Sequence, residues 1–464
     1  MASSGSSVPH TRILLGLVLG AVIGSAVNYL TTPPPVLANP QRDALASVVG
    51  HAATAPTPAL ERAAWVGWTV RNVTKPIGDI FLNLLFMAII PLVFASLTVG
   101  VTRLGGTGNV GRVGAKTLGY FLVTTACAAT IGLTLVNFIK PGDQVPPEQR
   151  DELMAYYGKE AGEKLETKAD FGINTVVNVV PRNPLKAFVE KDMLALIFSA
   201  ILVGIALTQI DPNRAKLIVE FLEGINHITD FIIRLAMKMA PYAVFALIFS
   251  TTALFGYKLL VALGAFVLTV LGGLLIHQCV VLPILVLVLG GMSPITFFQK
   301  VRVTMITAFS TSSSSATLPT AMKCAEEELN VPPAVSRFVL PLSASMNHNG
   351  TALFEGVTVV FLAQVFGFDL TIEQQLIVLV LCVLTATGMA GVPGGSLPLI
   401  GMVLAVVGVP AGAIAIVLGV DRFLDMCRTT VNVTADMTTA VFVARTERGR
   451  ESEPLAASRS SQYS

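Results

Sequence analysis

The chain has 464 residues, of which 53% are hydrophobic and 13% are charged, and its mean hydropathy is +0.71. Several stretches reach the roughly 20 apolar residues that cross a bilayer, so composition predicts an all-α polytopic membrane protein. The net charge of +2 gives no indication of a nucleic-acid partner, and the five cysteines form no CxxC pair that would indicate a zinc site or a disulfide framework.

Apolar segments and polar breaks alternate along the whole chain. An apolar run at 13–29 lacks a convincing small-residue cleavage site, so we predict a first membrane helix rather than a removed signal peptide. Prolines predict a loop at 31–58, and 140–185 is the longest polar insertion. We predict a cytoplasmic tail at 1–11 and a disordered tail at 446–464. The apolar segments lie at 12–31, 76–102, 113–139, 186–210, 218–256, 259–290, 335–367, 374–408 and 410–444.

Basic residues at the ends of these segments predict their orientation. Under the positive-inside tendency, the ends that carry them face the cytoplasm, as does the N-terminus. The insertion at 140–185 is then external. The basic residues concerned are Arg103, Arg112, Lys116, Arg214, Lys216, Lys300, Arg302, Arg445, Arg448 and Arg450.

Two segments, 295–333 and 374–408, are interrupted by residues that do not favour a continuous helix. The first contains a run of hydroxyl residues at 310–315 followed by Pro319, and the second contains TGMAGVPGGS at 387–396. Non-helical backbone at membrane depth must be buried in protein or line a wet cavity. Paired interruptions of this kind indicate two re-entrant hairpins beside a transporter binding site. The alternative is a pair of kinked spans with small-residue helix contacts.

Between these hairpins, the apolar stretch 338–365 contains the polar sequence NHNGT at 347–351. We predict an unwound turn in which Gly350 supplies the backbone angle of the break. Oxygen atoms freed there suit a small hard cation. Two titratable residues lie in the same stretch, His348 in the turn and Glu355 beyond it, and both are candidate proton carriers.

The last apolar segment carries charges that are costly in lipid. Its charged and amide residues fall within roughly 80° of one another on a helix. Burying one charge at bilayer depth costs about 3 kcal/mol or more. These side chains must therefore face a partner, an ion or a substrate. They are Asp421, Asp425, Arg428, Asn432 and Asp436.

These motifs, in this order, resemble the glutamate/aspartate and dicarboxylate:cation symporter family over nearly the whole chain. The matching motifs are SSSSATLP at 312–319, the turn at 347–351, GVPGG at 391–395 and the charged pattern from Asp421 to Asp436. The resemblance implies eight transmembrane helices plus two re-entrant hairpins, an elevator-type mechanism and a homotrimer. It assigns 12–256 mainly to a trimerisation scaffold and 257–445, together with the helix at 113–139, to a transport domain.

The resemblance also assigns roles in substrate binding. A planar guanidinium pairs with a carboxylate in bidentate fashion, so Arg428 is expected to hold the side-chain carboxylate of an acidic substrate. Asp425 is expected to hold the α-ammonium, which dicarboxylates lack. Both residues are present, so an acidic amino acid fits best, with a C4-dicarboxylate or broader amino-acid carrier as the alternative. The other implied substrate contacts are Thr429, Asn432, Thr351, the backbone of Ser313 and Ser314, and a gate at 392–395 that includes Val392 and Gly395.

Cation coupling is expected to depart from the family pattern. Asn349 replaces an aspartate and His348 a methionine in the turn, while Glu355 occupies the position of a proton-carrying glutamate. Losing a carboxylate weakens a sodium site, so protons are expected to replace some or all of the sodium. The implied cation-binding residues are Asn347 and Asp436 for Na⁺, Asn349, Thr124, Thr125 and Asp421, with hairpin carbonyls near 386–389.

The sequence therefore predicts a symporter of L-glutamate and L-aspartate, coupled to Na⁺ and/or H⁺, with no cofactor, in the lipid of a cell (inner) membrane. An additional arginine, found in many relatives at the positions of Ser312 or Met426, is absent. One rival is an intramembrane hydrolase, which needs a base beside a nucleophile, and the intramembrane histidines are His277 and His348. The other rival is a channel, but two hairpins that could each act as a gate favour alternating access over an open pore.

Overall fold

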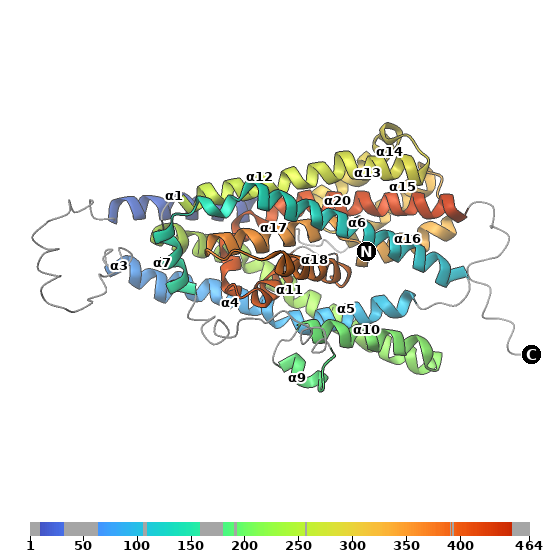
Figure 1. The fold of residues 1–464 in the computed structure, drawn as a ribbon, viewed down its shortest axis with the longest axis horizontal. Helices are drawn as coiled ribbons and strands as arrows, with labels where there is room; N and C mark the ends of the chain where they lie inside the picture. The colour runs from blue at the N-terminus through green and yellow to red at the C-terminus, as the bar shows by residue number, and fades with distance from the viewer. Residues whose placement is uncertain are drawn as a thin grey trace, which may run out of the picture.

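A computed structural model describes residues 10–31, 64–104, 109–157, 180–189, 193–255, 258–389, 391 and 394–447, and every regular element in these ranges is helical (Figure 1). Most of the predicted loop at 31–58 and most of both predicted tails lie outside the described residues. The α-helices are α1 (His10–Thr31), α3 (Ala64–Thr69), α4 (Lys75–Met87), α5 (Ile89–Leu104), α6 (Asn109–Ile139), α7 (Pro147–Tyr157), α9 (Pro184–Val189), α10 (Met193–Gln209), α11 (Pro212–Phe255), α12 (Lys258–Ile276), α13 (Leu282–Leu285), α14 (Pro294–Thr311), α15 (Ser314–Glu327), α16 (Pro333–Met346), α17 (Asn349–Val365), α18 (Ile372–Thr387), α19 (Ser396–Val406) and α20 (Leu418–Glu447).

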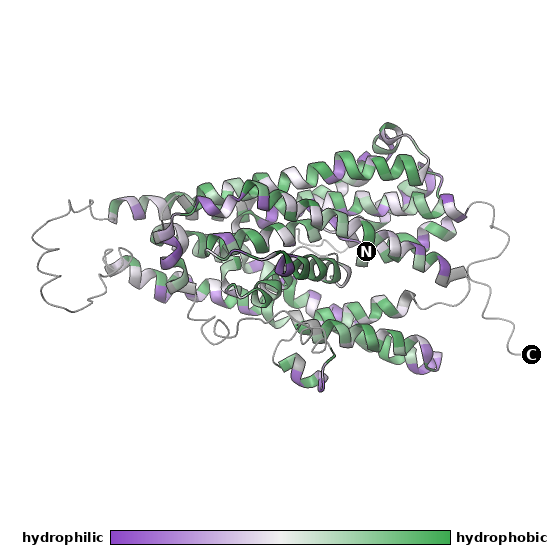
Figure 2. Ribbon diagram, in the orientation of Figure 1, coloured by the Kyte–Doolittle hydropathy of each residue, from purple (hydrophilic) through white to green (hydrophobic). Residues whose placement is uncertain are grey.

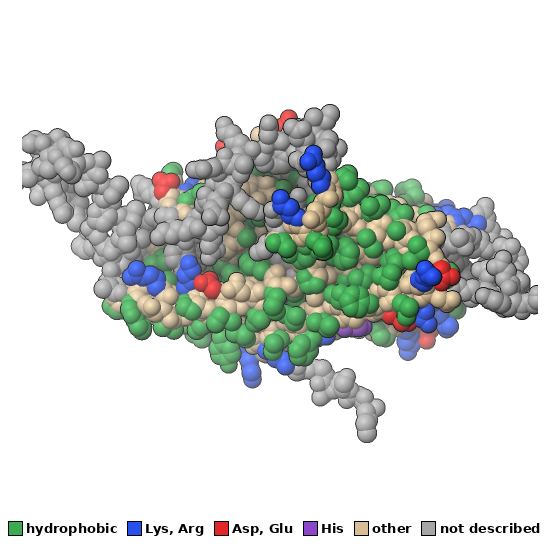
Figure 3. All heavy atoms as spheres, turned by 90° about the horizontal axis from the view of Figure 1, so that it is seen from below, with side chains coloured by type: hydrophobic (Ala, Val, Ile, Leu, Met, Phe, Trp, Pro, Cys, Tyr) green, Lys and Arg blue, Asp and Glu red, His purple; other side chains and the backbone are tan. Residues whose placement is uncertain are grey.

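The surface of the helices is largely apolar. Four helical stretches in the described residues are long and apolar enough to cross a membrane: Trp65–Thr102, Arg112–Gln144, Pro212–Leu254 and Leu259–Gly290. Hydrophobic residues cover most of the long helices in Figure 2, and broad hydrophobic patches cover the middle of the face in Figure 3. Leu268 on α12 is 71% exposed and Tyr242 on α11 is 72% exposed. Contiguous exposed apolar surface of this extent fits contact with lipid.

Three helix ends predicted to share one side of the membrane lie together. The C-terminal end of α5, the start of α6 and the C-terminal end of α20 meet at the right-hand end of Figure 1. Glu447 ties two of these elements by accepting from Arg112 at 2.9 Å and from Lys116 at 2.6 Å. The arrangement agrees with the orientation expected from the basic residues.

Helix α1 packs on α11 through a ladder of small residues. A Cβ added at Gly16 would lie 2.5 Å from the carbonyl oxygen of Pro241, and one at Gly20 would lie 2.8 Å from that of Phe245. A Cβ at Gly24 would lie 2.9 Å from the carbonyl oxygen of Phe249. Because the glycines lack a Cβ, the two backbones approach as closely as in small-xxx-small membrane packing.

Both interrupted segments form pairs of helices joined by a non-helical tip, as predicted. Helix α14 ends at Thr311 and α15 begins at Ser314, with Ser312 at φ 49° and Ser313 extended between them. A left-handed non-glycine residue costs about 1–3 kcal/mol and tends to occur at functional sites. In the second pair, α18 ends at Thr387 and α19 begins at Ser396, with Gly394 at φ 79°.

The polar turn between these hairpins is also non-helical, but it is shorter than predicted. Helix α16 ends at Met346 and α17 begins at Asn349, so the break comprises Asn347 and His348 alone. The prediction that Gly350 supplies the backbone angle of the break is wrong, because Gly350 lies inside α17 and is not among the residues of positive φ. Its missing Cβ serves helix packing instead: a Cβ there would lie 2.6 Å from the carbonyl oxygen of Arg428 on α20.

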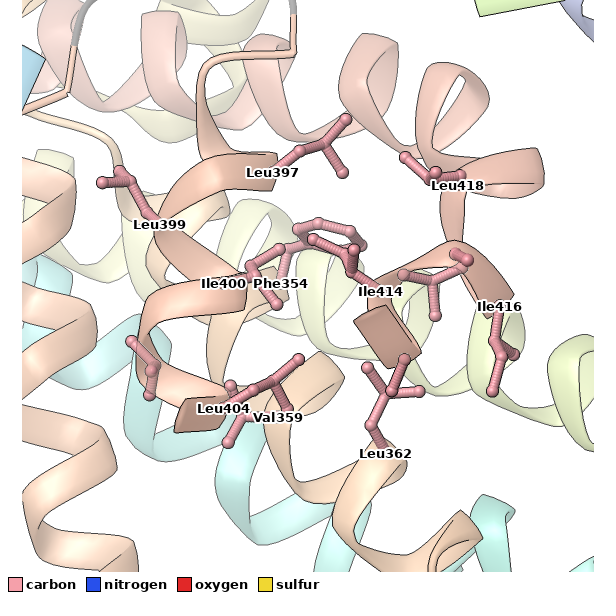
Figure 4. Packing of buried hydrophobic residues seen from close by; sticks show 14 of the residues in the cluster. Phe354, Val359, Leu362, Leu397, Leu399, Ile400, Leu404, Ile414, Ile416 and Leu418 are labelled. Atoms are coloured by element: carbon pink, nitrogen blue, oxygen red, sulfur yellow. The ribbon is translucent and has the colours of Figure 1, made fainter. Parts of the chain in front are cut away.

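Helix α17 lies at the centre of the largest hydrophobic core, and all its residues are buried. Figure 4 shows Phe354, Val359 and Leu362 of α17 near Ile400 and Leu404 of α19 and the short helical segment that contains Ile414. Close packing on all sides fixes side-chain positions. The polar residues at the start of α17 are therefore held against α20 by a rigid apolar support.

Candidate functional site

The predicted charged face of α20 forms a buried network of ion pairs. Nη1 of Arg428 lies 2.9 Å from Oδ1 of Asp421, and its Nε and Nη2 both lie 2.9 Å from Oδ1 of Asp425. All three residues are buried. A buried charge is tolerated only when it is paired and hydrogen-bonded, so the three side chains stabilise one another.

A fourth member of the network, Arg422, was not predicted. Its Nη2 lies 3.1 Å from Oδ2 of Asp425 and 3.5 Å from Oδ2 of Asp421, and its side chain is 2% exposed. Arg422 lies roughly 40° beyond the edge of the predicted face on an ideal helix, and the long side chain reaches back to it. The signal that was present in the sequence is an arginine three residues before Asp425 inside an apolar segment.

The guanidinium of Arg428 is also fixed by an aromatic ring. Its central carbon lies 4.3 Å from the centre of the Phe354 ring. Phe354 belongs to α17 and is labelled in Figure 4 among the packed apolar side chains. A guanidinium over an aromatic face gains about 0.5–2 kcal/mol. The position of the Arg428 guanidinium is therefore fixed by the Phe354 ring and by the two carboxylates together.

Helices α17 and α20 are joined by hydrogen bonds at the same level. Oδ1 of Asn432 accepts from the backbone N–H of Gly350 at 2.7 Å, and its Nδ2 donates to Oγ1 of Thr351 at 3.1 Å. The predicted substrate contacts Asn432 and Thr351 are thus brought together. Thr429 is buried one residue after Arg428.

Substituting Gly350 with alanine is expected to damage the site without touching a charge. The added Cβ would meet backbone atoms of Arg428, which cannot rotate away, so α17 must move from α20 and the bond to Asn432 lengthens. Overpacking of this kind costs about 1–3 kcal/mol. We expect a lower melting temperature, and weaker substrate binding because Asn432 and Arg428 are displaced. Gly264→Ala on α12 is the control, because nothing lies within 4 Å of its added Cβ; equal behaviour of both variants would contradict the close approach.

The tips of the two hairpins meet above the charged network. Oγ of Ser313 donates to the carbonyl oxygen of Gly391 at 2.7 Å, and the same hydroxyl caps α15 by accepting from the N–H of Ala316. The N–H of Gly394 donates to Oδ2 of Asp425 at 3.3 Å. Both tips are therefore linked directly or indirectly to α20. Of the other predicted contacts, Ser314 and Gly395 are buried at these tips, and Val392 lies outside the described residues.

The predicted sodium ligands Asn347 and Asp436 are in contact. Nδ2 of Asn347 donates to Oδ1 of Asp436 at 2.9 Å, and both side chains are buried. Among the described residues, Oδ1 of Asn347 has no hydrogen-bond partner. A carboxylate beside an unpartnered buried amide oxygen fits the ligand preference of a hard cation.

A second polar cluster surrounds Asn349. Its Oδ1 accepts from Oγ1 of Thr125 at 2.8 Å and lies 3.4 Å from Oγ1 of Thr124. Asn347, also predicted for this site, contacts Asp436 instead, whereas the other three predicted residues form this cluster. The cluster gains a member that was not predicted in this role, because Nδ2 of Asn349 lies 3.2 Å from Nε2 of His277. The four side chains of this cluster are neutral or titratable, and none of them is a carboxylate.

The two candidate proton carriers lie near the second hairpin. Nδ1 of His348 donates to the carbonyl oxygen of Ala386 at 2.8 Å, and Oγ1 of Thr385 donates to Oε2 of Glu355 at 2.7 Å. Oε1 of Glu355 and Nε2 of His348 have no hydrogen-bond partner in the part of the chain that the structure describes. Both residues thus contact the end of α18, next to the carbonyls at 386–389.

A buried ionic site among apolar helices, with two non-helical hairpin tips above it, defines an integral membrane protein built to bind small charged solutes. Residues 10–446 match the sequence profile of the sodium:dicarboxylate symporter family. The chain belongs to this family of transporters.

Individual relatives extend the match over most of their length. The proton/sodium-glutamate symport protein of Bacillus subtilis is 36% identical over 375 residues, covering 80% of this chain and 86% of the relative. The proton/glutamate-aspartate symporter of Escherichia coli is 33% identical over 436 residues, covering 94% and 92%. The C4-dicarboxylate transport protein of Bacillus subtilis is 32% identical over 377 residues, covering 80% and 87%.

Proposed function

We propose that this protein imports L-glutamate and L-aspartate by symport with Na⁺ and/or H⁺. The observation that carries the proposal is the pairing of Arg428 with Asp425 in one buried site. A guanidinium binds a carboxylate, and a carboxylate binds an ammonium. Together, Arg428 and Asp425 therefore match the side-chain carboxylate and the α-ammonium of an acidic amino acid. The related glutamate and glutamate-aspartate symporters support the same substrates and co-ions.

In this proposal the bound substrate replaces ion pairs within the protein by ion pairs between the protein and the substrate. Its side-chain carboxylate takes the guanidinium of Arg428, and its ammonium takes Asp425. Asn432, Thr351, Thr429, Ser313 and Ser314 supply polar contacts around the α-carboxylate. Gly395 and the rest of the second hairpin tip cover the site.

We also propose the domain arrangement that the resemblance implies. Residues 12–256, without the helix at 113–139, form a scaffold in a homotrimer, and 257–445 move with that helix as an elevator across a cell (inner) membrane. Eight transmembrane helices and two re-entrant hairpins complete this topology. Contacts of both hairpin tips with one another and with α20 support their belonging to one moving unit.

For the co-ions, we propose Na⁺ at Asn347 and Asp436, and proton coupling through His348 or Glu355. The neutral side chain of Asn349 beside Thr124 and Thr125 supports a weakened sodium site there, because a formal charge is missing. Asp421 is held by two arginines, which favours a structural part in the ion network over direct cation binding.

The hydrolase alternative is not favoured by the contacts of the two histidines. His277 contacts Asn349, His348 contacts Ala386, and Ser313 donates its proton to a backbone carbonyl. A serine nucleophile requires a base within hydrogen-bond reach. The dicarboxylate alternative is favoured by one observation, the second guanidinium of Arg422, and is developed below.

Uptake by purified protein in proteoliposomes tests the function. Sodium and pH gradients are imposed separately, and accumulation of radiolabelled aspartate and glutamate is measured. We expect accumulation under at least one gradient, with dependence on the proton gradient. Accumulation of succinate without aspartate would contradict the amino-acid assignment, and complete dependence on sodium alone would contradict proton coupling.

A further inference from the structure

Arg422 gives the site a second guanidinium whose hydrogen-bonding capacity is not used. Of its nitrogen atoms, only Nη2 contacts the carboxylates, whereas Nε and Nη1 are buried and have no hydrogen-bond partner in the described chain. Buried donors without a partner cost about 1–3 kcal/mol each. An acceptor that enters the site would therefore find two donors available.

The guanidinium of Arg422 lies next to the second hairpin. A Cβ added at Gly394 would lie 3.1 Å from Nη2 of Arg422, and the N–H of Gly394 donates to Asp425. Gly394 has φ 79°, where a side chain is disfavoured as well. The hairpin tip thus closes directly over Arg422 and Asp425, where a bound solute would be covered.

The two aspartates and two arginines of the network carry equal and opposite charge, which affects which substrates the site can accept. Each carboxylate divides its oxygens between the two arginines: Oδ1 of Asp421 and Asp425 contact Arg428, and Oδ2 of each contacts Arg422. The two carboxylates and two guanidiniums sum to zero charge. An acidic amino acid brings an ammonium that can neutralise Asp425, whereas a dicarboxylate such as succinate has two carboxylates and no ammonium. Without Arg422, the uncompensated charge of Asp425 would therefore repel a dicarboxylate.

We propose that Arg422 is a specificity-determining residue that allows the site to accept four-carbon dicarboxylates as well as acidic amino acids. When the substrate is an amino acid, its ammonium displaces Nη2 of Arg422 from Oδ2 of Asp425, and Arg422 stays paired with Asp421. When the substrate is a dicarboxylate, which has no ammonium, Arg422 stays on Asp425 and neutralises it, and one of its free donors is available to a substrate carboxylate. This inference rests on the proposed function, since it requires the site at Arg428 to bind the first carboxylate.

The test compares two substrates in one preparation of proteoliposomes. The ratio of kcat/KM for aspartate to that for succinate is measured for the wild type and for Arg422→Gln, so that the amount of active protein cancels. We expect succinate uptake by the wild type. In Arg422→Gln we expect the ratio to rise roughly tenfold or more in favour of aspartate, because the ammonium of aspartate neutralises Asp425 and succinate has no such group.

Two further variants keep the test decisive. Arg337→Gln is the control, because Arg337 has a 69% exposed side chain and a single 3.7 Å ion pair, and its ratio should equal that of the wild type. Arg422→Lys retains the charge but loses the planar fork; we expect an intermediate ratio, and this variant decides the matter if Arg422→Gln does not fold.

The outcomes separate this inference from the proposed function. A ratio that stays at the wild-type value in both Arg422 variants overturns the role of Arg422, as does wild-type uptake of aspartate that succinate neither shares nor inhibits. Failure of the wild type to take up either substrate under any imposed gradient overturns the proposed function itself.

Discussion

Replacing Arg428 with glutamine is expected to abolish high-affinity uptake of acidic substrates. The variant removes the guanidinium that contacts Oδ1 of both Asp421 and Asp425, and it removes the group that would bind the substrate carboxylate. Truncating one partner of a buried charged pair costs about 2–5 kcal/mol. At about 1.4 kcal/mol per tenfold, the KM for aspartate should rise roughly 30-fold or more. Proteoliposome uptake over a range of aspartate concentrations measures it.

The comparison with Arg428→Lys separates charge from geometry. Lysine keeps the positive charge but has neither the bidentate fork nor the planar group that lies over the Phe354 ring. We expect an affinity between those of the wild type and the glutamine variant. An unchanged KM in Arg428→Gln, with normal expression and melting temperature, would remove Arg428 from the substrate site.

The second large effect is expected from restoring a carboxylate to the neutral cluster around Asn349. In the double variant His348→Met, Asn349→Asp, an added charge would lie beside Thr124 and Thr125. Two unit charges about 4 Å apart interact by up to about 4 kcal/mol at an effective dielectric constant of about 20. We therefore expect the sodium concentration for half-maximal uptake to fall roughly tenfold or more, and sodium gradients alone to drive accumulation.

The single variant His348→Met is the matched control for the sodium experiment. It removes the contact with Ala386 but adds no charge, so the sodium dependence should stay at the wild-type level while any dependence on the proton gradient that passes through His348 disappears. A double variant with wild-type sodium dependence would show that the cluster around Asn349 binds no sodium.

Much of the fold was predictable because each prediction depended on a local pattern. Hydroxyl residues and Pro319 predicted the tip between α14 and α15, and the glycines at 391–395 predicted the break between α18 and α19. The turn at Asn347 and the charged face of α20 followed from polar residues in apolar segments. In each case the residue type itself disfavours a lipid-facing helix.

Two of the three missed features depend on tertiary contacts. Gly350 was expected to be a backbone hinge, but glycine is needed there because an added Cβ would lie 2.6 Å from the carbonyl oxygen of Arg428. Arg422 lies off the predicted face of α20, and its reach toward Asp425 depends on a long flexible side chain. The contact of His277 with Asn349 joins residues far apart in the sequence. The contacts of Gly350 and His277 could not be read from a short window of sequence, whereas the pair of Arg422 and Asp425, three residues apart on one helix, could have been.

The glycine ladder between α1 and α11 has a mechanical consequence. With backbone resting on backbone along three successive turns, neither helix can slide past the other without carbonyl oxygens colliding with Cα atoms. The two helices are therefore expected to move as one rigid unit. Any sliding between helices during a transport cycle must therefore occur at another helix–helix interface, where the contacts are made by side chains that can change rotamer.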